Sequence, residues 1–136
     1  MKTVYTYGVF DLFHAGHVAL LKEARALGDK LIVGLFTDEV AESFKRRPVI
    51  DLENRKQVLQ SCRFVDEVVV QEKKEPDETL LKLQPDILAK GPGAGWGEGS
   101  TTIPGAATMK QLGKEVVALS YHPGISTSEI IKKIKS

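Results

Sequence analysis

Short, continuous apolar runs alternate along the chain with longer segments whose apolar residues recur every three or four positions. Continuous runs such as Leu31-Ile32-Val33 and Val68-Val69-Val70 are typical of strands buried on both faces of a parallel sheet. The spaced segments predict amphipathic helices between these strands. We expect strands over 3–7, 30–36, 65–70, 86–89 and 115–119, helices over 16–27, 52–63, 76–83 and 104–112, a final helix beginning near 126 or 127, and a loop from Thr37 onward.

This alternation predicts the fold class. Strands that alternate with helices, with connections long enough for crossovers, indicate an α/β fold with a parallel sheet covered on both faces. Right-handed crossovers then give a doubly wound, five-stranded sheet in a single domain over residues 1–136. Ligands of such sheets bind beyond the carboxyl ends of the strands. Four unusual stretches fall at that edge, and we expect them to border one crevice: 8–17, 37–48, 90–105 and 121–127.

Composition narrows the class of protein. The chain is 42% hydrophobic and 27% charged, which is ordinary for a globular protein, and its formal charge of +1 predicts neither a nucleic acid nor a membrane surface as partner. Cys62 is the only cysteine, so a disulfide framework and a thiolate metal site are excluded. No signal peptide is expected, and no apolar stretch approaches the ~20 residues of a membrane span. We expect a cytoplasmic protein.

The most informative stretch runs from Gly8 to His17 and reads Gly-Val-Phe-Asp-Leu-Phe-His-Ala-Gly-His. It joins the first expected strand to a helix, whose N-terminus can face an anion, and it adds two imidazoles there. A helix N-terminus and imidazole N–H groups can stabilise the charge that builds on phosphoryl oxygens. They are therefore suited to a reaction in which a nucleophile attacks the α-phosphorus of a nucleoside triphosphate. Two capping histidines or a metal pair would also explain His14 and His17. Asp11 would hold a turn or a metal.

Three other stretches carry candidate phosphate-binding groups. In the basic run Lys45-Arg46-Arg47 we favour Lys45 as a clamp on the α-phosphate, and a solvated loop is the plain alternative. A cation near a helix N-terminus is mildly disfavoured, so Arg55 is expected to reach a phosphate or a carboxylate. The hydroxyls of Ser126 and Thr127 offer either an anion site or an N-cap for the last helix.

A glycine-rich segment follows the fourth expected strand and reads Gly91-Pro92-Gly93-Ala94-Gly95-Trp96. Glycines let the backbone approach a flat ring closely, so main-chain groups of this segment are expected to contact the base. The alternative is a lid that Trp96 packs down.

Together these residues resemble the cytidylyltransferase family, which includes glycerol-3-phosphate cytidylyltransferase and the catalytic domains of phosphocholine and phosphoethanolamine cytidylyltransferases. The resemblance covers nearly the whole chain, through Gly8–Asp11 with His14–His17, Thr37–Glu39, Glu53–Arg55, Arg63–Val68 and Gly124–Ser128. It implies a Rossmann-like fold, a homodimer, and Mg²⁺ carried mainly by the triphosphate. It also implies that His14 and His17 contact the triphosphate, that Lys45 is the loop lysine, and that Ser126 and Thr127 bind phosphate.

The resulting candidate site has two groups of residues. His14, His17 and Lys45 are expected to be catalytic. The residues expected to bind the nucleotide are Gly8, Val9, Phe10, Asp11, Gly16, Arg55, Lys90, Gly91, Trp96, Tyr121, His122, Gly124, Ile125, Ser126 and Thr127.

Two departures from the family pattern affect nucleotide recognition. Tyr121-His122-Pro123 stands where the family has an arginine that contacts the nucleotide, and the segment before Trp96 lacks the usual acidic pair. The first motif, with Arg47-Pro48-Val49 and Lys90-Gly91, is also similar to heptose-phosphate adenylyltransferases, whose last motif lacks that arginine too.

The sequence therefore predicts transfer of CMP from CTP to a small phosphorylated alcohol, with glycerol 3-phosphate as the first choice, giving a CDP-alcohol and pyrophosphate. Two alternatives stay open: an adenylyltransferase that acts on a heptose 1-phosphate, and a nucleotide-binding module without turnover.

Overall fold

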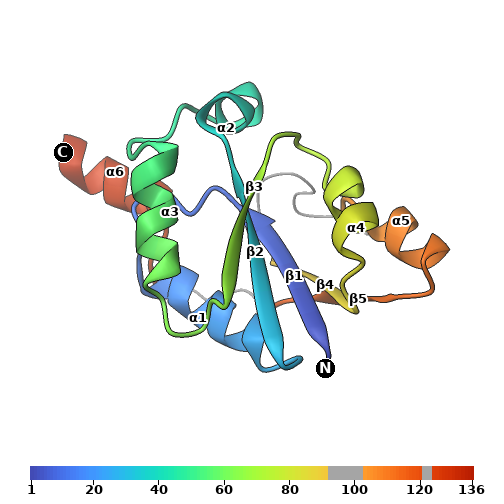
Figure 1. Ribbon diagram of the computed structural model, residues 1–136. Helices are drawn as coiled ribbons and strands as arrows, with labels where there is room; N and C mark the ends of the chain where they lie inside the picture. Colours follow the sequence, from blue (N-terminus) through green and yellow to red (C-terminus); the bar gives the residue numbers. More distant parts are fainter. Residues whose placement is uncertain (92–102, 121–123) are drawn as a thin grey trace.

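Five parallel strands form the centre of the molecule and run side by side in the order β3-β2-β1-β4-β5 (Figure 1). A computed structural model describes residues 1–91, 103–120 and 124–136. The strands are β1 (Thr3–Gly8), β2 (Lys30–Phe36), β3 (Glu67–Gln71), β4 (Ile87–Lys90) and β5 (Glu115–Ala118). The described ranges also contain six helices: α1 (Ala15–Arg25), α2 (Asp38–Phe44), α3 (Leu52–Gln60), α4 (Asp77–Leu83), α5 (Ala106–Gln111) and α6 (Thr127–Lys135). The α/β fold and its five-stranded parallel sheet are confirmed.

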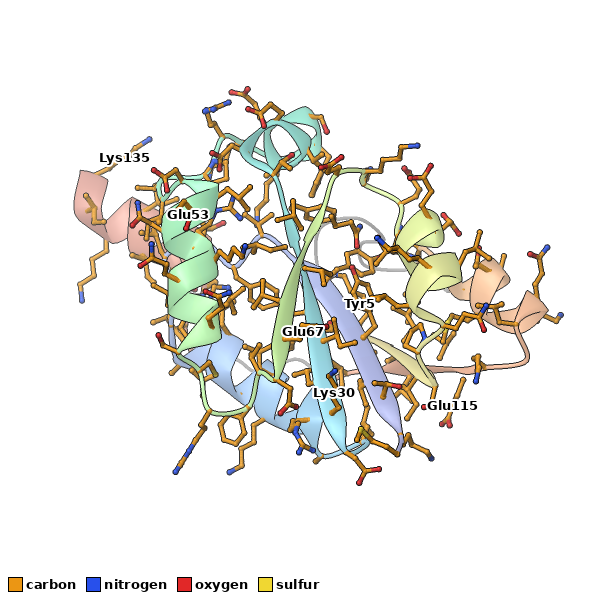
Figure 2. The ribbon with its side chains drawn as sticks, in the orientation of Figure 1. Tyr5, Lys30, Glu53, Glu67, Glu115 and Lys135 are labelled. Atoms are coloured by element: carbon orange, nitrogen blue, oxygen red, sulfur yellow. The ribbon has the colours of Figure 1, made fainter. Side chains whose placement is uncertain are left out.

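Each face of the sheet buries its own apolar cluster. On the first face, Val4, Val33 and Ala89 pack with residues of α1 and α3. On the second face, Tyr5, Tyr7 and Leu88 pack with residues of α2, α4 and α5. Figure 2 shows side chains filling the space on both sides of the sheet, with Tyr5 near its middle. The interior strand β2 is buried from Leu31 to Phe36, which explains its uninterrupted apolar sequence.

The strand order fixes where a ligand can enter. From β1 the chain steps outward to β2 and β3, and it then returns to place β4 and β5 on the opposite side of β1. The direction of winding therefore changes between β1 and β4, which is where such sheets open a crevice at their carboxyl edge.

The segment after Thr37 differs from the prediction, because most of it is helix α2 instead of loop. The Thr37 hydroxyl accepts a hydrogen bond from the Val40 N–H at 3.1 Å, and Asp38 and Glu39 occupy the first turn, where carboxylates are favourable. Ala41 is buried and Val40 and Phe44 are partly buried, so the apolar residues of this helix span a single turn, which is too short a pattern to reveal a helix. In the described part of the chain, no helix has the length and apolar character needed to cross a membrane.

Candidate active site

The turn between β1 and α1 is built on two left-handed residues. Phe10 and Leu12 have φ angles of 52° and 51°, which are uncommon for residues other than glycine. Phe10 is 8% exposed and packs in the first apolar cluster. Packing therefore holds the turn in a costly conformation, and it delivers His14 to the N-cap of α1.

His14 and His17 cap the helix and each other. The Nδ1 atom of His14 accepts a hydrogen bond from the Gly16 N–H at 3.0 Å, and His17 Nδ1 accepts from the His14 N–H at 3.3 Å. The two rings stack with centroids 3.8 Å apart. The capping role that the sequence left open is therefore correct. It uses only the Nδ1 atoms, so neither Nε2 atom takes part in the capping.

Two contacts, from the Gly16 N–H and the Thr127 hydroxyl, show which nitrogen of His14 carries the proton. Its hydroxyl donates to the Asp11 carbonyl oxygen at 2.9 Å and also lies 3.3 Å from His14 Nε2. A hydroxyl has a single hydrogen, so toward His14 the oxygen acts as an acceptor. His14 Nε2 therefore carries an N–H, which agrees with the acceptor role of its Nδ1 atom. His17 Nδ1 also accepts from a backbone N–H, so the proton of His17 lies on Nε2.

Burial keeps both imidazoles uncharged. The pKa of His17 is lowered to about 3. Desolvation is the largest cause, repulsion from His14 and Lys45 adds to it, and attraction by Asp11 opposes it. Desolvation also lowers the pKa of His14. At neutral pH the pair thus acts as neutral N–H donors, suited to oxygens on which charge develops.

Gly16 is required by the close packing of α1 against the His14 ring and the segment before α6. A Cβ atom at this position would lie 2.9 Å from His14 Cε1 and 3.2 Å from the Ile125 carbonyl oxygen. Any side chain would therefore push apart the His14 ring and the segment that leads into α6.

Asp11 holds the segment that carries Lys45. Its carboxylate accepts from the backbone N–H groups of Val49 and Ile50 at 2.8 and 2.9 Å, and it forms an ion pair with Arg46 at 3.0 Å. Burial raises the pKa of Asp11, but these three donors outweigh that effect, and the net shift is downward. Of the two roles that the sequence allowed, the structure shows Asp11 holding a turn.

Arg55 binds a carboxylate of the protein instead of the nucleotide. Its side chain is fully buried and donates to Asp38 Oδ1 at 2.7 Å and to the carbonyl oxygens of Val9 and Ile50 at 2.8 Å each. The expected carboxylate partner is present, but all three donor groups are used inside the protein. The expected contact between Arg55 and the nucleotide is therefore corrected: Arg55 ties α3 to α2 and to the end of β1.

The turn after β1, the start of α1, the end of α2 and the segment before α6 surround a pocket of about 270 Å³ at the carboxyl edge of the sheet. All four stretches that we expected to meet contribute to its wall, so their convergence is confirmed in the described part. The candidate residues that line it are Gly8, Val9, Phe10, Asp11, His14, Gly16, His17, Lys45, Lys90, Gly91, Ile125, Ser126 and Thr127.

Other candidates lie elsewhere or cannot be placed. Gly124 is exposed and not part of the pocket wall, and its φ of 116° sets the turn before α6. Trp96, Tyr121 and His122 fall outside the described residues. Several wall residues were not expected from the sequence: Thr6, Tyr7, Leu20, Phe36, Phe44, Ser120 and Ser128. Tyr7 and Phe36 lie near or at the carboxyl ends of the buried strands β1 and β2. This position in the sequence could have identified them as pocket residues.

Positive charge dominates the described pocket wall. Lys45, Arg46 and Lys90 face one carboxylate, that of Asp11, which Arg46 already pairs. Burial and then repulsion by Arg46 lower the pKa of Lys45 despite the attraction of Asp11, and burial with repulsion by Lys45 lowers the pKa of Lys90 to about 8. The pocket is therefore built for an anion.

Comparison with known families agrees with this geometry. A model described as cytidylyltransferase-like matches residues 5–133. The chain belongs to the cytidylyltransferase-like family. The resemblance to cytidylyltransferases, which rested on five motifs along the chain, is thereby confirmed at the level of the family.

Relatives of this cytidylyltransferase-like chain include longer proteins. It is 39% identical over 137 residues to the bifunctional protein HldE of Methylobacillus flagellatus and 40% identical to that of Yersinia enterocolitica, each match covering 99% of this chain. The matches cover 27% and 28% of the relatives' lengths. Among solved structures, a lipopolysaccharide core biosynthesis protein from Thermoplasma volcanium superposes with a TM-score of 0.77 and 26% identity, over 90% of this chain and 99% of that one.

The cytidylyltransferase-like pocket offers little to hold a metal ion by itself. The described residues contain no group of three or more His, Cys, Asp or Glu side chains placed for a metal. Asp11, the carboxylate of the described wall, is already occupied by three hydrogen-bond donors. The described side chains therefore do not form a cation site of their own.

Proposed function

We propose that this chain transfers the adenylyl group of ATP to the phosphate of a heptose 1-phosphate, giving ADP-heptose and pyrophosphate. The observation that carries the proposal is the 39–40% identity to HldE proteins over 99% of the chain, because HldE proteins act in ADP-heptose synthesis. The similarity to a lipopolysaccharide core biosynthesis protein supports it. These relatives favour the alternative raised from the sequence over CTP and glycerol 3-phosphate.

The aromatic side of the pocket supports an anionic acceptor. Phe36 lies edge-on to Tyr7 and to Phe44, with ring centroids 5.6 and 5.3 Å apart. Lys90 Nζ lies 4.3 Å from the Tyr7 ring centroid, and Lys74 Nζ lies 5.3 Å from that of Phe44. The rings of Tyr7 and Phe44 thus already have a lysine ammonium beside them, and these ammonium groups would repel the quaternary ammonium of phosphocholine. A sugar phosphate fits better, since its phosphate is attracted by the lysines.

The proposed reaction is an in-line displacement. A phosphate oxygen of the acceptor attacks the α-phosphorus, a new P–O bond forms, and the bond from the α-phosphorus to the bridging oxygen breaks as pyrophosphate leaves. The acceptor phosphate is already ionised near neutral pH, so no general base is required. The Nε2–H of His17 would donate to an oxygen of the triphosphate, the Nε2–H of His14 would be shared between the Thr127 hydroxyl and the triphosphate, and Lys45 would offset charge at the α-phosphate.

Three further features belong to the proposal. A divalent cation, Mg²⁺ by expectation, would arrive with the triphosphate because Asp11 is occupied. The chain would act as a homodimer in the cytoplasm. Light scattering on the purified protein tests the dimer.

Pyrophosphate release tests the function directly. Each of the four nucleoside triphosphates is combined with heptose 1-phosphate, glycerol 3-phosphate and phosphocholine. We expect release with ATP and heptose 1-phosphate. Release with CTP and glycerol 3-phosphate alone would restore the first sequence hypothesis. Nucleotide binding without release from any pair would favour the binding module.

A further inference from the structure

Lys90 stands on the opposite face of the sheet from the histidines. Leu88 packs in the second apolar cluster and Ala89 in the first, so the alternation along β4 directs Lys90 to the same face as Tyr7. Its Nζ donates to the Tyr7 carbonyl oxygen and lies over the Tyr7 ring. Helix α1, whose first turn carries His17, covers the other face. The pocket thus wraps around the carboxyl end of β1.

The charge of Lys90 is not balanced within the described residues. It forms no ion pair with any described carboxylate, and the charged group that acts on it most is another cation, Lys45. Asp11 is paired with Arg46. The ammonium group has three N–H donors, and a carbonyl oxygen of β1 accepts one hydrogen bond from it. Among the described residues, these contacts leave N–H donors of Lys90 for an anionic ligand.

The reaction geometry indicates which anion this is. In an in-line displacement, the attacking and leaving oxygens lie on opposite sides of the phosphorus. On the proposed function, the leaving pyrophosphate lies over His14 and His17 at the start of α1. The attacking phosphate must then approach from the other face, which Tyr7, Phe44 and Lys90 line.

We therefore propose, resting on the function proposed above, that Lys90 binds the phosphate of the acceptor rather than the nucleotide, and so selects an anionic acceptor. This changes the role of a residue that the sequence assigned to nucleotide binding. Lys45, between the two faces, would serve both reactants.

Binding of the acceptor then depends on the protonation of Lys90. The groups that face it are Lys45 across the pocket, with Arg46 and Asp11 beyond, and Tyr7 beneath it, whose own pKa is raised by burial. The free site loses the Lys90 proton as the pH rises through about 8, while a bound phosphate dianion favours the charged form. Affinity for the acceptor should therefore fall above pH 8.

Kinetics of the purified chain test this assignment, with ATP and heptose 1-phosphate varied separately. Lys90→Met removes the charge, Lys90→Arg keeps it, and Lys82→Met on the exposed side of α4 is the matched control. We expect Lys90→Met to raise the KM for the acceptor about tenfold or more, the effect of one charge-assisted hydrogen bond, with the KM for ATP within twofold. The acceptor KM of the wild type should rise above pH 8, and that of Lys90→Met should not. Lys90→Arg should recover part of the loss, and Lys82→Met should match the wild type.

An equal rise in the KM for ATP would assign Lys90 to the nucleotide and overturn the proposal, and so would an unchanged KM for both reactants. If Lys90→Met does not fold by circular dichroism, Lys90→Gln takes its place in the same measurements.

A binding measurement separates this proposal from the proposed function. Inorganic phosphate is titrated into the chain saturated with a non-hydrolysable ATP analogue. If no acceptor supports turnover, the proposed function fails, yet loss of phosphate binding in Lys90→Met would still support the role of Lys90. Unchanged phosphate binding in Lys90→Met would overturn it.

Discussion

The Thr127 hydroxyl lies 3.3 Å from His14 Nε2, although 113 positions separate the two residues in the chain. The same hydroxyl donates to the Asp11 carbonyl oxygen. One atom of α6 therefore joins the start of α1 to the turn after β1. It sets both the position of the His14 ring and the nitrogen that carries its proton.

Thr127→Val tests this contact, because valine keeps the shape and removes the hydroxyl. The His14 ring loses the acceptor that fixes its Nε2–H, and we expect turnover to fall about 10- to 100-fold, somewhat less than the loss of a direct transition-state donor. Thr127→Ser keeps the oxygen and should stay within a few fold of the wild type. Steady-state rates with saturating nucleotide and acceptor measure both. Equal rates for Thr127→Val and the wild type would show that the hydroxyl does not position His14.

Asp11→Asn tests the link between the first turn and the segment that carries Lys45. The amide loses the ion pair with Arg46 and one of its two good acceptors, so we expect the free energy of unfolding to fall by about 1–3 kcal/mol. Turnover should fall as well, because Lys45 loses its anchor. Arg47→Gln is the control, since the ion pairs of Arg47 with Glu39 and Glu42 are exposed and their loss should change stability by under about 1 kcal/mol. Urea denaturation provides both values. Equal stability of the two variants would show that Asp11 does not hold the segment that carries Lys45.

Arg55→Met tests the correction made to that residue. It leaves Asp38 and the carbonyl oxygens of Val9 and Ile50 without a buried donor, and we expect a loss of about 3–5 kcal/mol in the free energy of unfolding. The dissociation constant for ATP, measured on the folded fraction by calorimetry, should stay within about threefold. A large loss of ATP affinity at unchanged stability would return Arg55 to the nucleotide site.

Because His17 is held neutral by burial, we expect the folded chain to lose stability in mild acid. Its pKa is about 3 in the folded chain and near the ordinary 6.5 when unfolded. Between these values the unfolded chain binds more protons, so the stabilisation is complete above pH 6.5 and is lost as the pH falls toward 3. Thermal melts from pH 7 to pH 5, above the range of most carboxylates, should show a falling midpoint. The fall should be shallower in His17→Gln. Parallel curves for the two proteins would show that His17 is not held neutral.

Much of the fold follows from local patterns. Continuous apolar runs such as 31–36 mark strands buried on both faces, and Ser126 before Thr127 marks the start of the last helix as an N-cap. Helix α2 could not be found in this way, because its apolar residues Val40, Ala41 and Phe44 span a single turn. Its N-cap, Thr37, was the remaining signal.

The site was only partly predictable for a related reason. The motif residues His14, His17 and Lys45 could be named because their types and spacing indicate phosphate chemistry. The role of Arg55 could not, because the choice between a phosphate and Asp38 depends on how α2 and α3 pack. The face of the sheet to which Lys90 points depends likewise on the register of β4 beside β1, which is a property of the assembled sheet.

A single competition reaction tests the central claim most directly. The purified chain is incubated with equal concentrations of ATP, CTP, GTP and UTP, together with heptose 1-phosphate and glycerol 3-phosphate, and the products are identified by mass spectrometry. We expect ADP-heptose and pyrophosphate as the main products, and neither from a variant in which His14 and His17 are both alanine. CDP-glycerol as the main product would contradict the account.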